Sequence, residues 1–300
     1  GATYASARRL FHPEAFRVVL FDQRGCGRTC AVPGAPEGAN TTAHLVEDIA
    51  QLRVEVARVT QWDVVYGGSW GATLALAYAQ ARPGETQALV LRSLGLWEPA
   101  DVAWLYEAGG ASHFFPEAFG PYEARARAAE KVGDEGSLLR TYARLLEHED
   151  QDVRVDAARH FYGWEAAIAG FEAGSGPAGS LPAPADPAVA DAMAGAAALE
   201  AQYALNRGWF APGQLLEGCA QLTDTDVTIV HGRYDMICRP SGAAAAAGRL
   251  PRCALRFVHA GHSDEAPALR SAIIHALDTV ASARYEDLRA GVQAKVVIDG

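Results

Sequence analysis

The sequence predicts an α/β fold, in which a mostly parallel β-sheet carries helices on both faces. In the first third, short β-branched runs alternate with segments of helical periodicity, which is the pattern of a parallel sheet with helical crossovers. From Trp97 to about Glu217 the chain is instead rich in Ala, Glu, Arg and aromatic residues and predicts helices only. The alternation then resumes. We therefore predict a first part of the core at 1–96, a helical cap at 97–217 and a second part of the core at 218–300.

The first part of the core contains three predicted strands and two predicted helices. Each strand is a short apolar run that ends in a polar or glycine-rich turn, and Thr41 or Thr42 is a suitable N-cap for the first helix. The predicted strands are 17–21, 62–66 and 88–92, and the predicted helices are 41–59 and 72–82. Crossovers in such a sheet are expected to be right-handed.

The remaining elements follow from the same patterns. The cap is expected to hold helices at 99–109, 121–131, 136–148, 152–169 and 187–206. The segment 174–187 is rich in Gly and Pro and predicts a loop. The second part of the core is expected to hold strands at 227–231 and 254–258 and helices at 241–250 and 266–280. The last twenty residues carry mixed signals and predict a tail or a further helix.

Composition excludes several classes of protein. The 300 residues are 50% hydrophobic and 21% charged, which suits a globular chain with a sizeable core. The net charge of −10 repels phosphate backbones, so we expect no nucleic-acid partner. No apolar run is long enough to span a membrane, and the first residues lack the apolar core of a signal peptide. The five cysteines form no disulfide pattern, so a cytoplasmic location is expected.

The strongest motif is Gly67-Gly68-Ser69-Trp70-Gly71, which fits G-x-S-x-G between a predicted strand and a predicted helix. Such a turn is so sharp that the glycines must lack a Cβ, and it presents the Ser69 hydroxyl at the edge of the sheet. The main-chain N–H of Trp70 then points to where an oxyanion would form. The pattern predicts a nucleophile at Ser69; a glycine-rich turn that only packs tightly is the alternative.

A serine nucleophile needs a base and a carboxylate that orients the base. In this strand order the acid and then the histidine follow the serine along the chain. Asp235 and His262 have that order, and each comes just after a predicted strand, so both are expected at the same sheet edge as Ser69. His259 is a weaker candidate because it lies at the end of its strand. Asp224 and Asp226 precede their strand and fall at its wrong end.

Other motifs are weaker. The segment from Gly25 to Cys30 begins like a dinucleotide-binding loop but ends in cysteine, so that fingerprint fails. The pairs His259/His262 and Cys26/Cys30 have no partner pair at zinc spacing. We therefore expect no metal or organic cofactor.

Five segments together resemble a known family. They are Phe21-Asp22-Gln23-Arg24-Gly25-Cys26-Gly27-Arg28, Asn40-Thr41-Thr42 with Leu45-Val46-Glu47-Asp48-Ile49, Gly67 to Gln80, His231-Gly232-Arg233-Tyr234-Asp235, and Ala260-Gly261-His262-Ser263. They are similar to the corresponding segments of the proline iminopeptidases (prolyl aminopeptidases), which have the α/β-hydrolase fold. The resemblance covers residues 8 to about 278, and the match over the serine turn and its helix is highly specific.

The resemblance implies a serine aminopeptidase that removes N-terminal proline from peptides without a cofactor. It implies Ser69 as nucleophile, Asp235 as orienting acid and His262 as base. It also implies that two cap glutamates, Glu165 and Glu200, bind the α-ammonium of the substrate. Gly68, beside the nucleophile, is assigned to substrate binding. A carboxylate is a suitable partner for such a cationic terminus.

The chain departs from the family at its start. The family has an H-G-G-P-G segment upstream of the D-Q-R-G strand, and its backbone supplies the second oxyanion donor. The chain begins about where that segment ends, with Gly1 as its last remnant. We therefore expect the N-terminal strands to be absent, and one lost oxyanion donor typically costs about 10²–10³ in rate. Two alternatives to the aminopeptidase function stay open. One is an esterase or other serine hydrolase of the same fold, and the other is an inactive fragment or binding protein.

Overall fold

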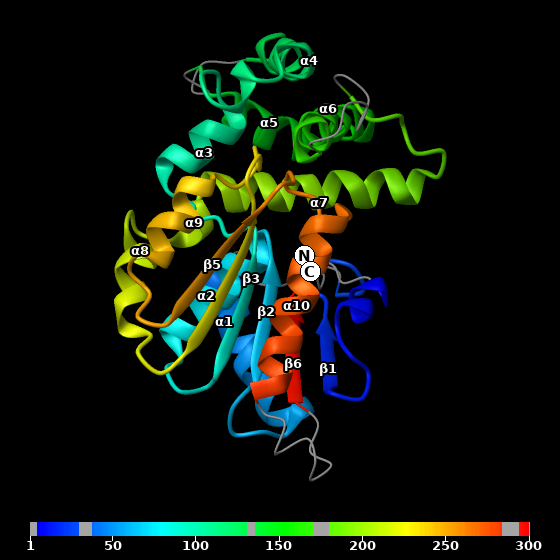
Figure 1. Cartoon of the computed structure of the whole chain (residues 1–300). Coiled ribbons are helices and arrows are strands. Elements are labelled where there is room, and N and C mark those ends of the chain that lie inside the picture. The colour runs from blue at the N-terminus through cyan, green and yellow to red at the C-terminus, as the bar shows by residue number, and fades with distance from the viewer. Residues whose placement is uncertain (1–4, 30–37, 131–135, 171–179, 284–293, 300) are drawn as a thin grey trace. The chain divides into compact units, whose positions relative to one another are not determined.

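A computed structural model describes residues 5–29, 38–130, 136–170, 180–283 and 294–299. The chain divides into two compact units, one made of residues 1–96 and 213–300 and the other of residues 97–212 (Figure 1). The described strands all belong to the first unit, and the described residues of the second unit form helices and connecting segments. The division into a core at 1–96 and 218–300 and a cap at 97–217 stays a prediction.

The first unit is built on a six-stranded sheet, and every pairing between its described strands is parallel. Its strands are β1 (Phe16–Phe21), β2 (Val64–Gly68), β3 (Ala88–Arg92), β4 (Asp226–Gly232), β5 (Cys253–Val258) and β6 (Ala294–Asp299). The spatial order is β1-β6-β2-β3-β4-β5. Because parallel strands end at one edge, the turns after β2, β4 and β5 meet there, which is where a ligand site forms in such sheets.

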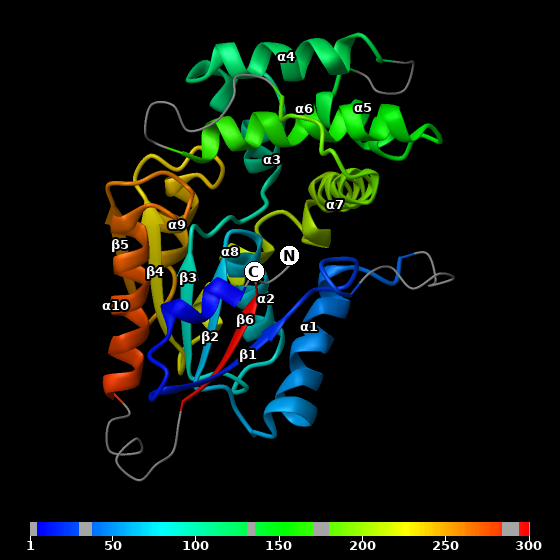
Figure 2. The same cartoon turned by 90° about the vertical axis from the view of Figure 1, so that its right-hand side faces the viewer.

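Helices cover both faces of this sheet, as the sequence predicts. The helix α10 (Pro267–Ala283) lies on one face, and α1 (Thr42–Gln51) and α2 (Trp70–Ala81) lie on the other (Figure 2). Buried side chains of α10 pack in one core cluster with residues of β2, β3 and β4, among them Val64, Val90 and Val230. The residues of α2 from Gly71 to Ala79 are all buried, which explains why that helix is apolar all round.

The strand β6 corrects the expectation for the end of the chain. Residues 281–283 extend α10, and residues 294–299 form a strand rather than a tail or a helix. This strand lies between β1 and β2, with Val297 paired to Val19 on one side and to Val65 on the other. It is therefore part of the sheet interior. Its run of β-branched residues suits that place, but its partners are too distant in sequence for a local pattern to reveal them.

The second unit is an assembly of five α-helices with short 3₁₀ turns among the described residues. They are α3 (Pro99–Tyr106), α4 (Pro116–Arg127), α5 (Leu138–Leu146), α6 (Gln151–Ala169) and α7 (Pro187–Leu205). Aromatic rings fill its core: Tyr122 stacks on Tyr142 with centroids 4.4 Å apart, and Trp164 is fully enclosed. The loop predicted at 174–187 lies partly outside the described residues; residues 180–186 are neither helix nor strand.

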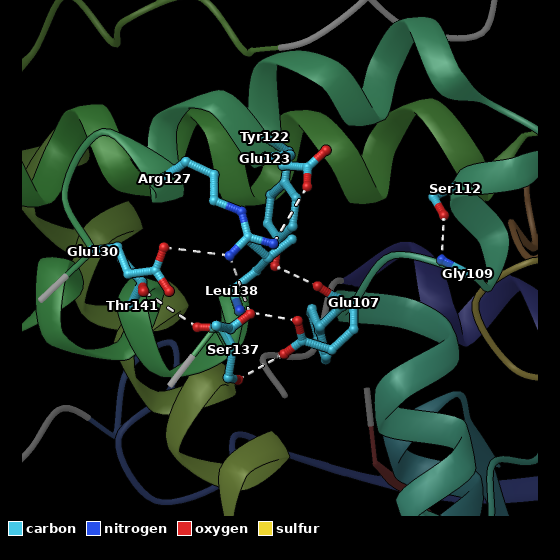
Figure 3. Close-up of polar contacts among 12 residues, drawn as sticks. Glu107, Gly109, Ser112, Tyr122, Glu123, Arg127, Glu130, Ser137, Leu138 and Thr141 are labelled. Carbon is cyan, nitrogen blue, oxygen red and sulfur yellow. Dashed lines mark hydrogen bonds and ion pairs between the residues drawn. The ribbon is translucent and has the colours of Figure 1, made fainter. Parts of the chain in front are cut away.

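The partly buried carboxylate of Glu107 contacts the start of α5 in this unit (Figure 3). The carboxylate of Glu107 accepts hydrogen bonds from the Ser137 hydroxyl at 2.7 Å and from the Leu138 N–H at 2.9 Å. The Leu139 N–H also donates to this carboxylate, at 3.3 Å, and the two N–H groups are among those that a helix leaves unpaired at its first turn. A negative charge at this end also interacts favourably with the positive end of the helix dipole. Glu107 therefore stabilises the start of α5, although about thirty residues separate the two along the chain.

The remaining short elements complete the first unit. They are the 3₁₀ turn Ala5–Leu10, the π-helical turn Leu52–Ala57 that ends α1, the helix α8 (Gln214–Gly218), the 3₁₀ turn Cys219–Gln221 and the helix α9 (Pro240–Ala247). No helix in the described ranges combines the length and the hydropathy that crossing a bilayer requires.

Candidate active site

The turn between β2 and α2 has the strained backbone that the G-x-S-x-G motif predicts. Ser69 has φ 56° and ψ −122°, a conformation that a residue with a Cβ rarely adopts. A Cβ added to Gly67 would lie 2.1 Å from the main-chain oxygen of Gly71, so only glycine fits there. The N–H of Ser69 donates to the main-chain oxygen of Arg92 at 2.8 Å. Neighbouring strands therefore fix Ser69 at the carboxyl edge of the sheet.

The structure brings Ser69, His262 and Asp235 together in one hydrogen-bonded chain. The Nε2 atom of His262 lies 2.9 Å from Ser69 Oγ. Its Nδ1 atom lies 2.9 Å from Asp235 Oδ2 and 3.0 Å from Oδ1. Asp235 and His262 follow β4 and β5, and their exposed fractions are 2% and 9%. The three strand ends therefore present a hydroxyl, an imidazole and a carboxylate in the order that nucleophilic catalysis requires.

The environment of Asp235 favours its charged form. Burial opposes the charge of this carboxylate, but His262 and the N–H of Cys238 outweigh burial and hold the pKa of Asp235 below its usual value. The N–H groups of Ile237 and Cys238 donate to Oδ1 at 3.0 and 2.8 Å. Asp235 is thus an anion that can orient the imidazole and stabilise it when it takes up a proton.

A second histidine, His231, lies behind Asp235 and was not among the predicted site residues. Its Nε2 atom is 2.9 Å from the main-chain oxygen of Cys238 and 3.6 Å from Asp235 Oδ2. Its ring is fully buried, and burial lowers the pKa of His231 despite the neighbouring carboxylate. A neutral His231 that donates to Cys238 holds the turn whose N–H groups bind Asp235.

The weaker candidates from the sequence, His259, Asp224 and Asp226, contact residues other than Ser69, His262 and Asp235. The ring of His259 packs against Tyr234 with centroids 4.8 Å apart. Asp226, at the start of β4, pairs with Arg252 at 2.7 Å. Asp224 precedes that strand and accepts from the Thr223 hydroxyl at 3.3 Å. None of the three takes part in the hydrogen-bonded chain that contains Ser69.

Trp70 and Gly68 flank the serine on either side. Trp70 is the first residue of α2, so its main-chain N–H belongs to the helix end that attracts negative charge. Its indole Nε1 donates to Oε1 of Gln23, a buried residue after β1, at 3.0 Å. A Cβ on Gly68 would lie 2.3 Å from a guanidinium nitrogen of Arg92. The turn is therefore held by the residues after β1 and by β3.

The second unit pairs the two predicted cap glutamates with each other. Glu165 lies on α6 and Glu200 on α7, and their carboxyl groups are hydrogen-bonded. The Tyr106 hydroxyl donates to Glu165 Oε1 at 2.9 Å. Burial, and then the charge of Glu200, raises the pKa of Glu165 well above its usual value; burial also raises the pKa of Glu200. Each carboxyl group therefore disfavours ionisation of the other.

This pair makes stability depend on pH in a stated direction. Because the pKa values of Glu165 and Glu200 are raised in the folded state, the pair's contribution is fully present below the unfolded carboxyl pKa and is lost as pH rises through the folded values. Glu200→Gln removes one carboxyl of the pair. The melting temperature of this variant relative to the parent is expected to rise as the pH increases above the unfolded carboxyl pKa of about 4.3.

The matched control for this measurement is Glu149→Gln, which neutralises an exposed carboxylate in the same unit. Its difference from the parent is expected to vary little across the same range. If the difference in melting temperature between Glu200→Gln and the parent stays constant, or falls as pH rises, the raised pKa values of the pair are contradicted.

Among the described residues, no group of three or more His, Cys, Asp or Glu side chains is arranged to hold a metal ion. The ring of His262 is engaged on both nitrogens by Asp235 and Ser69. Cys30, which with Cys26 forms one of the two weak metal-ligand candidates in the sequence, lies outside the described residues.

Comparison with known proteins shows the fold and the family of the chain. The model of a family described as alpha/beta hydrolase fold matches residues 4–264. The proline iminopeptidase of Neisseria gonorrhoeae is 36% identical over 274 residues, which are 91% of this chain and 83% of that protein. That of Xylella fastidiosa (strain 9a5c) is 37% identical with the same two coverages.

Solved structures share the fold at low identity. A putative lipase from Acinetobacter baumannii AYE superposes with a TM-score of 0.53 at 16% identity, and the match covers 88% of this chain and 74% of the lipase. At that identity the likeness shows the fold alone. The family model and the iminopeptidase relatives go further: this chain is a hydrolase that belongs to the proline iminopeptidase family of the α/β-hydrolase fold.

Proposed function

We propose that the protein is a serine aminopeptidase that releases N-terminal proline from peptides by way of an acyl-enzyme. The observation that carries the proposal is the hydrogen-bonded chain from Ser69 Oγ through His262 to Asp235, with 2.9 Å between the hydroxyl oxygen and the imidazole nitrogen. The relatives at 36% and 37% identity carry the name proline iminopeptidase, and this supports proline as the residue released.

The proposed acylation step uses all three residues. Ser69 Oγ attacks the carbonyl carbon of the N-terminal residue while His262 Nε2 accepts the hydroxyl proton. The carbonyl oxygen becomes an oxyanion that the Trp70 N–H stabilises. The scissile C–N bond then breaks, and His262 returns the proton to the nitrogen of the leaving peptide. Asp235 stays ionised and stabilises the transient imidazolium.

Deacylation repeats the step with water as nucleophile. His262 takes a proton from the water, the hydroxide attacks the acyl carbon, and the ester bond to Ser69 Oγ breaks. His262 then returns the proton to the serine oxygen. Proline is released with its carboxyl group formed, and the three residues regain their starting protonation.

The proposed specificity rests on charge. Glu165 and Glu200 are proposed to bind the cationic secondary amine of an N-terminal proline, because a buried carboxyl pair that holds one proton gains a full charge partner when the cation arrives. The Arg92 guanidinium fills the space where a Gly68 side chain would lie, so the role of Gly68 in substrate binding is proposed for its main chain. A peptide whose terminal nitrogen is acylated carries no such charge.

A panel of three substrates tests this proposal. Prolyl p-nitroanilide is expected to be hydrolysed, while N-acetylprolyl p-nitroanilide is expected to show a kcat/KM lower by at least about 100-fold, since it leaves buried carboxyl groups without their cation. The third substrate is p-nitrophenyl acetate. If only this ester is hydrolysed, the protein is an esterase; if the acetylated amide is cleaved as well as the free one, the amine-binding role is wrong.

A further inference from the structure

Arg92, the last residue of β3, contacts both halves of the proposed catalytic machinery. The strand β3 lies directly between β2, which leads to Ser69, and β4, which leads to Asp235. Arg92 pairs in register with Gly68 on one side and with Val230 on the other. Its position therefore places it at the carboxyl edge of the sheet, between the strands that carry the nucleophile and the acid.

The main chain of Arg92 holds the serine turn. Its carbonyl oxygen accepts the Ser69 N–H at 2.8 Å, which continues the β2–β3 ladder past the end of β2. The next residue, Ser93, donates its N–H to the Val230 oxygen at 2.9 Å. This segment thus links the strained serine to β4 through consecutive main-chain bonds.

The side chain of Arg92 holds the loop of the base. Its Nη1 donates to the main-chain oxygen of His262 at 3.3 Å. The same guanidinium packs flat against Gly68, where an added Cβ would lie 2.7 Å from Cζ. One residue therefore contacts the residue before the nucleophile and the residue that is the base.

The setting of this cation is costly for a purely structural group. Its Nε is buried and has no hydrogen-bond partner among the described residues. A buried donor without a partner destabilises the folded state, and such groups concentrate at functional sites. An apolar side chain would fill the space without that penalty, but it would leave the His262 carbonyl without this donor.

We propose that Arg92 is a positioning residue that fixes the imidazole of His262 relative to the Ser69 hydroxyl. This rests on the proposed function of those two residues. The Oγ–Nε2 distance of 2.9 Å must persist while the proton crosses, and a misplacement of about 1 Å can cost about 100-fold in rate. Arg92 keeps that distance by tying the loop of the base to the strand that bonds the nucleophile.

The test compares Arg92→Met and Arg92→Lys with the parent in hydrolysis of prolyl p-nitroanilide. Titration with a fluorophosphonate first counts the reactive serines, so that kcat is expressed per titrated site. Arg92→Met is expected to lower this kcat by about 100-fold with little change in KM. Arg92→Lys keeps one cationic donor for the His262 carbonyl but not the planar fork, so its kcat is expected to lie between the two, about 10-fold below the parent.

The rate of fluorophosphonate labelling separates positioning from folding. It depends on Ser69 and His262 but requires no prolyl substrate, and it is expected to fall in the same ratio as kcat. The matched control is Arg256→Met, which removes an exposed arginine from β5 and is expected to leave both rates unchanged.

The outcomes distinguish this inference from the function on which it rests. A parent protein that neither reacts with fluorophosphonate nor cleaves the prolyl amide would sink the proposed function. If the parent is active and Arg92→Met keeps the parent kcat per titrated site, with only a lower melting temperature, the positioning role is wrong. Should Arg92→Met not fold, a parent-like kcat per site in Arg92→Lys overturns the inference.

Discussion

Replacing Ser69 by alanine is expected to lower kcat for prolyl p-nitroanilide by about 10⁴-fold or more, because no other group can form the acyl-enzyme. The hydroxyl is the atom that the whole hydrogen-bonded chain serves, since His262 Nε2 lies 2.9 Å from it. Binding of the substrate does not require the hydroxyl, so KM is expected to change far less than kcat. The measurement is steady-state hydrolysis at saturating substrate.

A second serine in the same unit provides the control. Ser93 also has a positive φ, 54°, and its Oγ is buried with no hydrogen-bond partner among the described residues. Ser93→Ala removes an unsatisfied hydroxyl and is expected to leave kcat close to that of the parent. Parent-level hydrolysis by Ser69→Ala would exclude the nucleophile assignment. An equal loss in both variants would mean that disturbance of the backbone, and not the missing hydroxyl, lowers activity.

Replacing Val297 by proline is expected to have the largest effect on stability. Val297 lies in β6, with β1 on one side and β2 on the other, so its main-chain groups belong to the interior of the sheet. Proline removes the N–H that completes a ladder bond and leaves a carbonyl of the neighbouring strand without its donor. We expect the free energy of unfolding to fall by roughly 2–4 kcal/mol, with a melting temperature lower by roughly 5–15 °C.

Val297→Ala keeps the main-chain N–H and therefore separates the backbone effect from the side-chain effect. It is expected to be clearly more stable than Val297→Pro in chemical denaturation. The activity of Val297→Pro is also expected to fall, even at a temperature where the variant is still folded. The strand β6 pairs with both β1 and β2. Gln23, which follows β1, accepts a hydrogen bond from Trp70, which follows β2, so a disturbed β6 is expected to shift the serine turn. A proline variant as stable as the parent would show that residues 294–299 do not pair in solution as described.

The sheet and its helices could be predicted because most of their signals are local. Each strand other than β6 is a short run rich in apolar residues, and the structure changes its predicted limits by at most two residues. The association of Ser69, Asp235 and His262 was also predictable, since parallel strands end at one edge whatever the distance along the chain. Their roles in catalysis stay a proposal that the experiments above test.

Other features depend on contacts that no local pattern encodes. Residues 294–299 pair with strands near the start of the chain, so their short run looked like the end of a tail. The helix predicted at 121–131 instead begins at Pro116 and continues through Pro121. The proline removes one main-chain hydrogen bond from the second turn, and the packing of surrounding residues offsets this loss. Arg92 and His231 looked like ordinary strand residues, and only the neighbouring strands make them part of the site.

The place of β6 also bears on how the protein is synthesised. The strand β2 has β3 on one side, and its other edge pairs with residues 294–299, which are synthesised after the other described strands of the sheet. Until then a nascent chain exposes an open strand edge next to the serine turn, a state prone to intermolecular pairing. Pairing across so long a separation is slow. We therefore expect enzyme activity to arise only after residues 294–299 have been synthesised and paired, and its yield to depend on chaperones that shield that edge.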